Sequence, residues 1–168
     1  MAISENLDLF LVDDEPIQNE MLKDFLTERF TYNIKVFENG EEALDNMKIN
    51  PRIVILDYHL NNHNPKAKNG IEVLKEMKEK YPDTQIIMLS GQDRIDVAID
   101  TMKYGAFDYV VKGESGFNRI ENIINKVSEL NKLKILNEGY KRTITLLTIV
   151  IGLIIIGALV YGYLNPRP

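Results

Sequence analysis

The chain has 168 residues, enough for one domain of ordinary size with a short appendage, and its 45% apolar content excludes disorder over the whole length. It carries 25 acidic and 20 basic side chains, and the net charge of -5 argues against a nucleic-acid partner, because nucleic-acid-binding domains are usually basic. The absence of cysteine excludes disulfide scaffolds, Cys-ligated zinc, iron–sulfur clusters and thiol catalysis, and it fits a reducing compartment.

Five short runs of β-branched or apolar residues predict strands in the first two thirds of the chain. They cover residues 7–12, 32–37, 52–56, 85–89 and 107–111. The third and fourth runs are apolar on consecutive residues, which is typical of strands buried on both faces of a parallel sheet.

Helical patterns fill the intervals between these strands. The first begins at Pro16, a residue that suits the opening position of a helix, with Asp14 or Glu15 as its cap. The apolar stripes of the helices are, in chain order, Ile17, Met21, Leu22 and Phe25; Ala43, Leu44 and Met47; Ile71, Leu74 and Met77; Ile95, Ala98, Ile99 and Met102; and Ile120, Ile123, Ile124, Val127 and Leu130. Five β-α units within about 130 residues predict a doubly wound parallel α/β fold.

Polar side chains follow four of these strands at their carboxyl ends, where ligands bind in open α/β sheets. Asp13 and Asp14 follow the first strand, Asp57 the third, Ser90 the fourth and Lys112 the fifth. Crowded carboxylates repel one another, and a divalent cation such as Mg²⁺ resolves that conflict. One carboxylate can then attack phosphorus to form an acyl phosphate, whose charge a metal, a hydroxyl and a lysine would share.

These five residues, each closing a strand, resemble the signature of bacterial two-component response-regulator receiver domains over residues 7–130. The resemblance implies a flavodoxin-like (βα)5 fold with strand order 2-1-3-4-5 and Mg²⁺ as the cofactor. It also implies that Asp57 accepts a phosphoryl group from the phosphohistidine of a sensor histidine kinase or a phosphotransfer protein. By position, Asp14 would bind Mg²⁺ directly, Asp13 would bind it through water, and Asp57 and the backbone carbonyl of His59 would supply further oxygens.

The same resemblance assigns three residues to the phosphoryl group and to a switch. Ser90 and Lys112 would contact the phosphoryl oxygens. Tyr109 occupies the place of an aromatic switch, whose ring moves inward as the Ser90 hydroxyl follows the phosphate.

Two departures from the family pattern flank this site. Gly113 stands where receiver domains usually have a proline, and that substitution loosens the turn after Lys112. Residues 58–70 form a longer segment than usual and lack the proline commonly found just after Leu60. Because this segment borders Asp57, we expect it to alter kinase docking or the lifetime of the phosphate.

Taken singly, the same residues have ordinary explanations. Asp13 or Asp14 could cap a helix, Ser90 could be a turn hydroxyl, Lys112 a solvated cation and Tyr109 a core residue. Their joint placement at four strand ends favours the site. By contrast, His59 and His63 lie in an Asn-rich loop without matching partners, so we do not expect a histidine metal site.

The end of the chain has a different composition. All acidic residues and 19 of the 20 basic ones lie before residue 143, which gives residues 1–142 a net charge of -6, and residues 143–164 carry no charge. As a helix, that uncharged segment would extend roughly 33 Å, enough to cross a membrane. We therefore predict a receiver domain at 1–130, a juxtamembrane helical linker at 131–142, a transmembrane helix at 143–164 and a short tail at 165–168.

Basic residues predict the orientation of this span. Lys132, Lys134, Lys141 and Arg142 precede it and Arg167 alone follows it, which places the receiver domain on the cytoplasmic side of the inner membrane as a single-pass protein. An apolar stripe through Leu133, Leu136 and Tyr140 allows a continuous juxtamembrane helix or a short coiled coil, and with the latter a homodimer, with Gly139 as a candidate break.

These expectations combine into one functional reading and two alternatives. The first is a membrane-anchored single-domain response regulator, not an enzyme, which acts on an unknown downstream protein through the face that bears Ser90, Tyr109 and the helix at 93–104. The second is a pseudo-receiver, a membrane adaptor that is never phosphorylated. The third is a Mg²⁺-dependent phosphohydrolase, against which the absence of a D-x-D motif around Asp57 counts.

Overall fold

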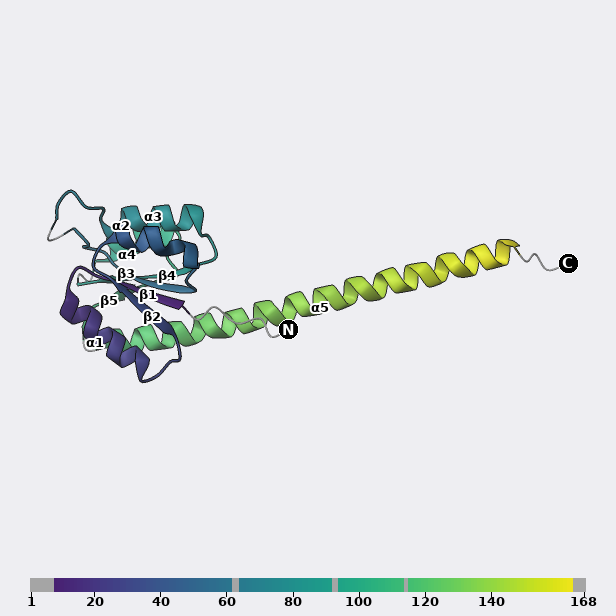
Figure 1. Cartoon of the computed structure of the whole chain (residues 1–168), viewed down its shortest axis with the longest axis horizontal. Coiled ribbons are helices and arrows are strands. Elements are labelled where there is room, and N and C mark those ends of the chain that lie inside the picture. Colours follow the sequence, from purple (N-terminus) through teal and green to yellow (C-terminus); the bar gives the residue numbers. More distant parts are fainter. Residues whose placement is uncertain (1–7, 62–63, 92–93, 114, 165–168) are drawn as a thin grey trace. The chain divides into compact units, whose positions relative to one another are not determined.

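The computed structural model describes residues 8–61, 64–91, 94–113 and 115–164 (Figure 1). The elements are β1 (Asp8–Val12), α1 (Pro16–Thr27), β2 (Asn33–Phe37), α2 (Gly40–Asn46), the 3-10 helix η1 (Met47–Ile49), β3 (Ile53–Asp57), α3 (Gly70–Lys80), β4 (Gln85–Ser90), α4 (Ile95–Lys103), β5 (Asp108–Val111) and α5 (Gly116–Leu164). The chain divides into two compact units, Met1–Asn125 and Lys126–Pro168.

The strands of the first unit form one parallel sheet in the order β2-β1-β3-β4-β5. This order confirms the predicted flavodoxin-like arrangement. All strands run in the same direction, but the order in which they are added changes between β1 and β3: β2 lies on one side of β1, and β3, β4 and β5 follow on the other. The connections that leave the carboxyl ends of β1 and β3 therefore lie on opposite faces of the sheet. The residues that follow Val12 and Leu56, which are register partners, therefore lie next to each other at a topological switch point.

Helices cover both faces of this sheet (Figure 1). Phe10 and Val54 point to the face covered by α2, α3 and α4, whose buried side chains include Ala43, Leu74 and Val97. The alternate strand residues point to the other face, because side chains alternate along a strand. There α1 is tied to the start of α5: the rings of Phe25 and Phe117 lie 5.3 Å apart, and Arg29 pairs with Glu121 at 3.3 Å.

Local sequence explains where several helices begin and end. Asn39 caps α2 by accepting a hydrogen bond from the backbone N–H of Glu42 at 2.8 Å. Asn69 and Glu72 form a reciprocal capping box at the start of α3. Gly105 ends α4 with a positive φ of 91°, which is accessible to glycine at little cost.

The buried face of α1 differs from the apolar stripe that the sequence predicted. Ile17 and Met21 are exposed, at 72% and 53%, whereas Asn19, Leu22 and Leu26 are buried. The side-chain amide of Asn19 donates to the backbone carbonyl of Asp13 at 2.7 Å, which allows a polar residue to take a core position. The predicted cap is also only partly right, because Glu15 holds the cap position but its side chain makes no cap hydrogen bond.

Helix α4 departs from the predicted stripe in the same way. Ile95, Ile99 and Met102 are exposed, at 77%, 49% and 48%, and the buried positions are Val97 and Thr101. The buried Thr101 hydroxyl has a hydrogen-bond partner within the helix, because it donates to the carbonyl of Ala98 at 2.8 Å. The helix thus turns its most apolar side to the surface.

Helix α5 runs without interruption from Gly116 to Leu164, so Gly139 does not break it. The segment Gly116–Gly157 contains a window long and apolar enough to cross a membrane, and no residue of that window is buried. The predicted boundaries at residues 130 and 142 fall inside this single helix and stay predictions.

The observed burial in α1 predicts effects of very different size for two substitutions of large apolar residues. Leu26→Ala should lower the free energy of unfolding by about 2–5 kcal/mol, because Leu26 is fully buried. Ile17→Ala should change it by less than about 0.5 kcal/mol, because Ile17 is exposed. Urea unfolding of the full chain in detergent micelles measures both, and equal losses in the two variants would contradict the observed burial.

Candidate functional site

The carboxyl ends of β1, β3, β4 and β5 bring the predicted polar residues together at one edge of the sheet. Asp57 is the last residue of β3, and Ser90 ends the neighbouring β4, where it pairs in register with Val111, the residue before Lys112. Asp13 and Asp57 are buried, with 5% and 2% exposed, so neither carboxylate is hydrated as a surface carboxylate would be. All five residues lie where the sequence predicts them.

Lys112 is the cation of this cluster. Its Nζ lies 2.7 Å from Asp13 Oδ2 and 2.9 Å from Asp57 Oδ1, so one ammonium bridges two buried carboxylates. Burial alone would lower the pKa of Lys112, but its hydrogen bond to Asp13 and the charge of Asp57 outweigh that effect and raise the pKa. Lys112 therefore stays protonated and supplies the positive charge at the site.

The single ammonium does not neutralise the acids completely. Burial, and after it the negative charge of Asp13, raise the pKa of Asp57, while Lys112 and the backbone N–H of His59 lower it to a smaller extent. The ionised Asp57 carboxylate is therefore held in a site that disfavours its charge. A further cation would compensate this buried negative charge, so the site favours cation binding.

The carboxylate of Asp14 meets the requirement for such a cation. It is only 9% exposed, and neither of its oxygens has a hydrogen-bond partner among the described residues. One oxygen each from Asp13, Asp14 and Asp57 lies within 4.8 Å of the others. A buried carboxylate without a partner is costly, whereas three hard oxygen donors at this spacing suit Mg²⁺, so the residues fit the predicted ion.

Backbone groups orient two of the three acids. Asp13 Oδ1 accepts from the N–H of Glu15 at 2.9 Å, and Asp57 Oδ2 accepts from the N–H of His59 at 2.8 Å. Each carboxylate thus keeps one oxygen on the backbone and turns the other toward Lys112. The backbone of His59 lies beside Asp57, and the role of its carbonyl oxygen as a ligand stays a prediction, while His63 lies outside the described residues.

Ser90 and Tyr109 occupy positions compatible with their predicted roles. Ser90 is fully buried, and its backbone carbonyl accepts from the N–H of Lys112 at 2.7 Å, which couples the ends of β4 and β5. Tyr109 is 8% exposed and belongs to the core cluster, and it also lines a groove beside α4. The switch itself stays a prediction.

Two residues that shape the site were not recognised as site residues from the sequence. Asn19 anchors the carbonyl of Asp13 from inside α1, and only its polarity within an apolar stripe could have indicated this role. Gly70 lies so close to Asp57 that a Cβ there would be 2.1 Å from the backbone oxygen of Asp57. Gly113, at φ 156°, has a backbone conformation that proline cannot adopt.

The raised pKa of Asp57 predicts that its charge destabilises the folded protein. The folded state binds the Asp57 proton more tightly than the unfolded state does, so stability falls as pH rises through the folded pKa. Asp57→Asn should therefore raise the free energy of unfolding at pH 7 without Mg²⁺, and Mg²⁺ should stabilise the wild type more than the variant. Thermal unfolding of the full chain measures both effects.

The exposed Asp45 provides the control, since Asp45→Asn removes the same charge away from the site. That variant should respond to Mg²⁺ as the wild type does. If the wild type were as stable as Asp57→Asn in the absence of Mg²⁺, the claim that the ionised Asp57 carboxylate destabilises the folded state would be wrong.

Comparisons with known proteins agree with this geometry. Residues 9–125 match the response regulator receiver domain family. The chain is 31% identical over 122 residues to the chemotaxis protein CheY of Thermotoga maritima, which covers 72% of this chain and 97% of that protein. It is 33% identical over 132 residues to an NtrX-like response regulator of Rickettsia felis, which covers 76% of this chain and 26% of that protein.

The solved structures show the same fold. The receiver domain of NtrX from Brucella abortus matches with a TM-score of 0.65 at 24% identity, covering 73% of this chain and 98% of that one. The chain spans 26% of the length of the Rickettsia relatives, so the similarity to them concerns their receiver portion. The family match covers most of the chain and includes every residue of the acidic site, and the chain therefore belongs to the response regulator receiver domain family.

Proposed function

We propose that this chain is a membrane-anchored response regulator whose Asp57 accepts a phosphoryl group, in the presence of Mg²⁺, from the phosphohistidine of a sensor kinase or phosphotransfer protein. The observation that carries the proposal is the charge arrangement: a buried Asp57 bridged by Lys112, beside an Asp14 carboxylate with no partner among the described residues. In a purely structural cluster, buried carboxylates usually accept from a protein donor, whereas an acid without one suits a cation ligand.

Each residue has a distinct part in this transfer. Asp57 Oδ1, which faces Lys112, is the oxygen that attacks phosphorus, because Oδ2 is held by the N–H of His59. Lys112 then shifts from the carboxylates toward the transferred oxygens, and Ser90 follows as a hydroxyl donor. Asp13, Asp14 and Asp57 would hold Mg²⁺, which when bound neutralises the charge that accumulates on the phosphoryl group.

The output of this switch is contact with another protein rather than catalysis. A groove of about 760 Å³ beside α4 is lined by Arg94, Ile95, Ile99, Met102 and the ring side of Tyr109. The exposed apolar residues of α4 make this face suitable for a protein partner, a second copy of the chain included. Because Tyr109 lines the groove and lies on β5, three residues before Lys112, its ring would connect phosphorylation to that face.

The second unit would hold this switch at the inner membrane. Residues 143–164 form the uncharged part of α5, and four basic residues within residues 131–142 precede them. The positive-inside bias places the receiver unit in the cytoplasm, where kinases have access to Asp57.

Phosphoryl transfer predicts a defined mass change. The full chain in detergent micelles, incubated with Mg²⁺ and acetyl phosphate, should gain one phosphate by intact-mass spectrometry. The gain should vanish in Asp57→Asn and on chelation of Mg²⁺, and Lys112→Ala should slow it by roughly 10²-fold, because the only ammonium at the described site is lost.

The outcome separates the switch from an unphosphorylated adaptor. Unchanged mass with every small-molecule donor and with phosphorylated kinase domains, although Mg²⁺ still stabilises the protein, would overturn the switch in favour of the adaptor.

Insertion of the uncharged segment into a membrane predicts where the chain is found when cells are separated into membrane and soluble fractions. The full chain should sediment with membranes and resist alkaline carbonate extraction, because its uncharged helical segment can cross the bilayer. A variant truncated after residue 142 should be released. Recovery of the full chain in the soluble fraction without detergent would contradict the anchor, and digestion of the receiver unit by protease added outside spheroplasts would contradict its orientation.

A further inference from the structure

Of the segment between β3 and α3, the structure describes residues 58–61 and 64–69, and both its start and its end lie beside Asp57. At its start the N–H of His59 binds the Asp57 carboxylate at 2.8 Å. At its end the N–H of Gly70 donates to the carbonyl of Tyr58 at 3.0 Å, and Gly70 lies against the Asp57 backbone with no room for a Cβ. The end of the segment is therefore in direct contact with the backbone of the residue proposed to carry the phosphate.

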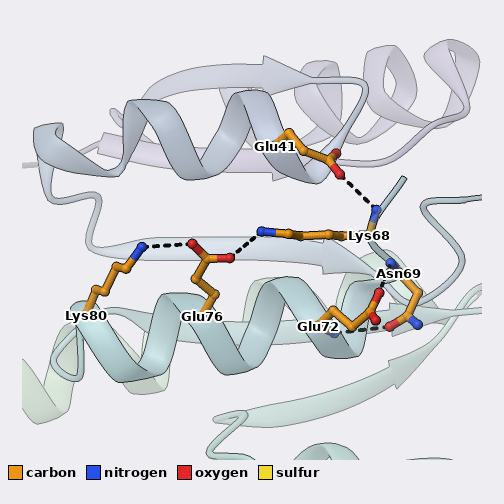
Figure 2. Close-up of polar contacts among 6 residues, drawn as sticks. All are labelled: Glu41, Lys68, Asn69, Glu72, Glu76 and Lys80. Carbon is orange, nitrogen blue, oxygen red and sulfur yellow. Dashed lines mark hydrogen bonds and ion pairs between the residues drawn. The ribbon is translucent and has the colours of Figure 1, made fainter. Parts of the chain in front are cut away.

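Lys68 attaches the end of this segment to two helices at once. Its backbone N–H donates to Glu41 Oε1 on α2 at 2.8 Å, and its ammonium pairs with Glu76 on α3 (Figure 2). Lys80 holds the other oxygen of Glu76 at 2.8 Å. Hydrogen bonds from Lys68 and then Lys80 lower the pKa of Glu76 to about 2, so that the acceptor remains charged at neutral pH.

The residue after Lys68 continues this attachment into the helix. Asn69 accepts from the N–H of Glu72 at 3.1 Å, and Glu72 accepts from the N–H of Asn69 at 2.9 Å (Figure 2). Lys68, Asn69 and Gly70 thus form a continuous rigid connection from α2, through the start of α3, to the backbone of Asp57.

The same segment forms one wall of the cleft onto which Asp14 opens. The cleft has a volume of about 790 Å³, and Leu60, Asn64, Lys66 and Ala67 line it from the segment. Glu38 and Glu41 line it from the side of α2. Since Asp14 lies in this lining, the cleft is a route by which water reaches the acidic site, and its width depends on where the segment is held.

We propose that Lys68 is a positioning residue that sets the lifetime of the phosphoryl group on Asp57, by holding residues 64–69, the end of this segment, against α2 and α3. The proposal rests on the proposed function, since it concerns the acyl phosphate of that same site. It applies to the extended segment of this chain, whose attachment is supplied by Glu41 and Glu76.

The step that Lys68 controls is hydrolysis. A water oxygen forms a bond to phosphorus as the bond between phosphorus and the Asp57 oxygen breaks. The products are the Asp57 carboxylate and dihydrogen phosphate, which releases a proton to the solvent. Residues 64–69, when held in place, keep water in the cleft away from the attack position, and their release admits it.

Lys68 can act locally because its ion pair contributes little to global stability. Its side chain is 40% exposed and that of Glu76 is 29% exposed, and ion pairs with this exposure are largely screened. Loss of the pair should therefore leave the protein folded and release only the segment that it holds.

The half-life of the phosphorylated full chain tests the proposal. After removal of the donor, Lys68→Ala should shorten the half-life about fivefold relative to the wild type. Lys68→Arg should restore it, because a guanidinium can also reach Glu76. Lys80→Ala is the matched control, since Lys80 pairs with the same glutamate but does not touch the segment, and its half-life should be that of the wild type.

A second pair of variants tests the attachment to α2 without changing Lys68. Glu41→Gln retains an oxygen that accepts the Lys68 N–H, and it should keep the wild-type half-life. Glu41→Ala removes the acceptor and should shorten it. A half-life in Lys68→Ala that is unchanged or longer, or a change that Lys80→Ala shares, would overturn the proposal while leaving the proposed function intact.

Amide hydrogen exchange of the full chain separates failure of the proposal from failure of the proposed function. Residues 64–70 should exchange faster in Lys68→Ala and Glu41→Ala than in the wild type, Lys80→Ala or Glu41→Gln, whether or not Asp57 is phosphorylated. If the wild type takes up no phosphate, the proposed function fails. Equal exchange in all variants would overturn the positioning role by itself.

Discussion

The bridge that Lys112 forms between Asp13 and Asp57 is the interaction on which the site depends. Two carboxylates that leave water at the ends of adjacent strands would repel each other, and the ammonium of Lys112 lies within 2.9 Å of both. The bridge compensates the pair incompletely, since the pKa of Asp57 remains raised and Asp14 has no partner among the described residues. This remaining negative charge makes the folded chain receptive to a divalent cation.

The apolar core around the sheet offsets the free-energy cost of burying these charged groups. Burial of apolar side chains on both faces stabilises the fold at positions away from the carboxyl edge, where the polar residues gather. The surfaces next to that edge are left free for other uses. Apolar residues of α1 and α4 are exposed, and just before α3 Lys68 contacts Glu41 of α2 and Glu76 of α3.

Sequence patterns predicted the strands well, because runs of β-branched residues and strand-end polar residues are local signals, whereas the strand order followed from the resemblance to receiver domains. They were less successful with α1 and α4, where the apolar stripe was identified but its direction was not. In α1, Asn19 occupies the core position that the pattern reserved for an apolar residue, since its amide binds the backbone of Asp13. In α4, Thr101 is buried while Ile95 and Ile99 face solvent. Periodicity cannot separate a core face from an apolar docking face, because both repeat every 3.6 residues.

The sequence by itself determined the class of fold, the residues of the acidic site, its lysine and the uncharged segment of residues 143–164, because each depends on residue type at the end of an element or on composition. The tertiary structure alone decided which carboxylate lacks a partner, which helix faces are exposed, and how Lys68 connects α2 and α3 to Asp57. These features depend on pairs of residues far apart in the chain. Glu41 and Lys68 are separated by 27 positions, and only the packing of α2 beside the start of α3 brings them within 2.8 Å.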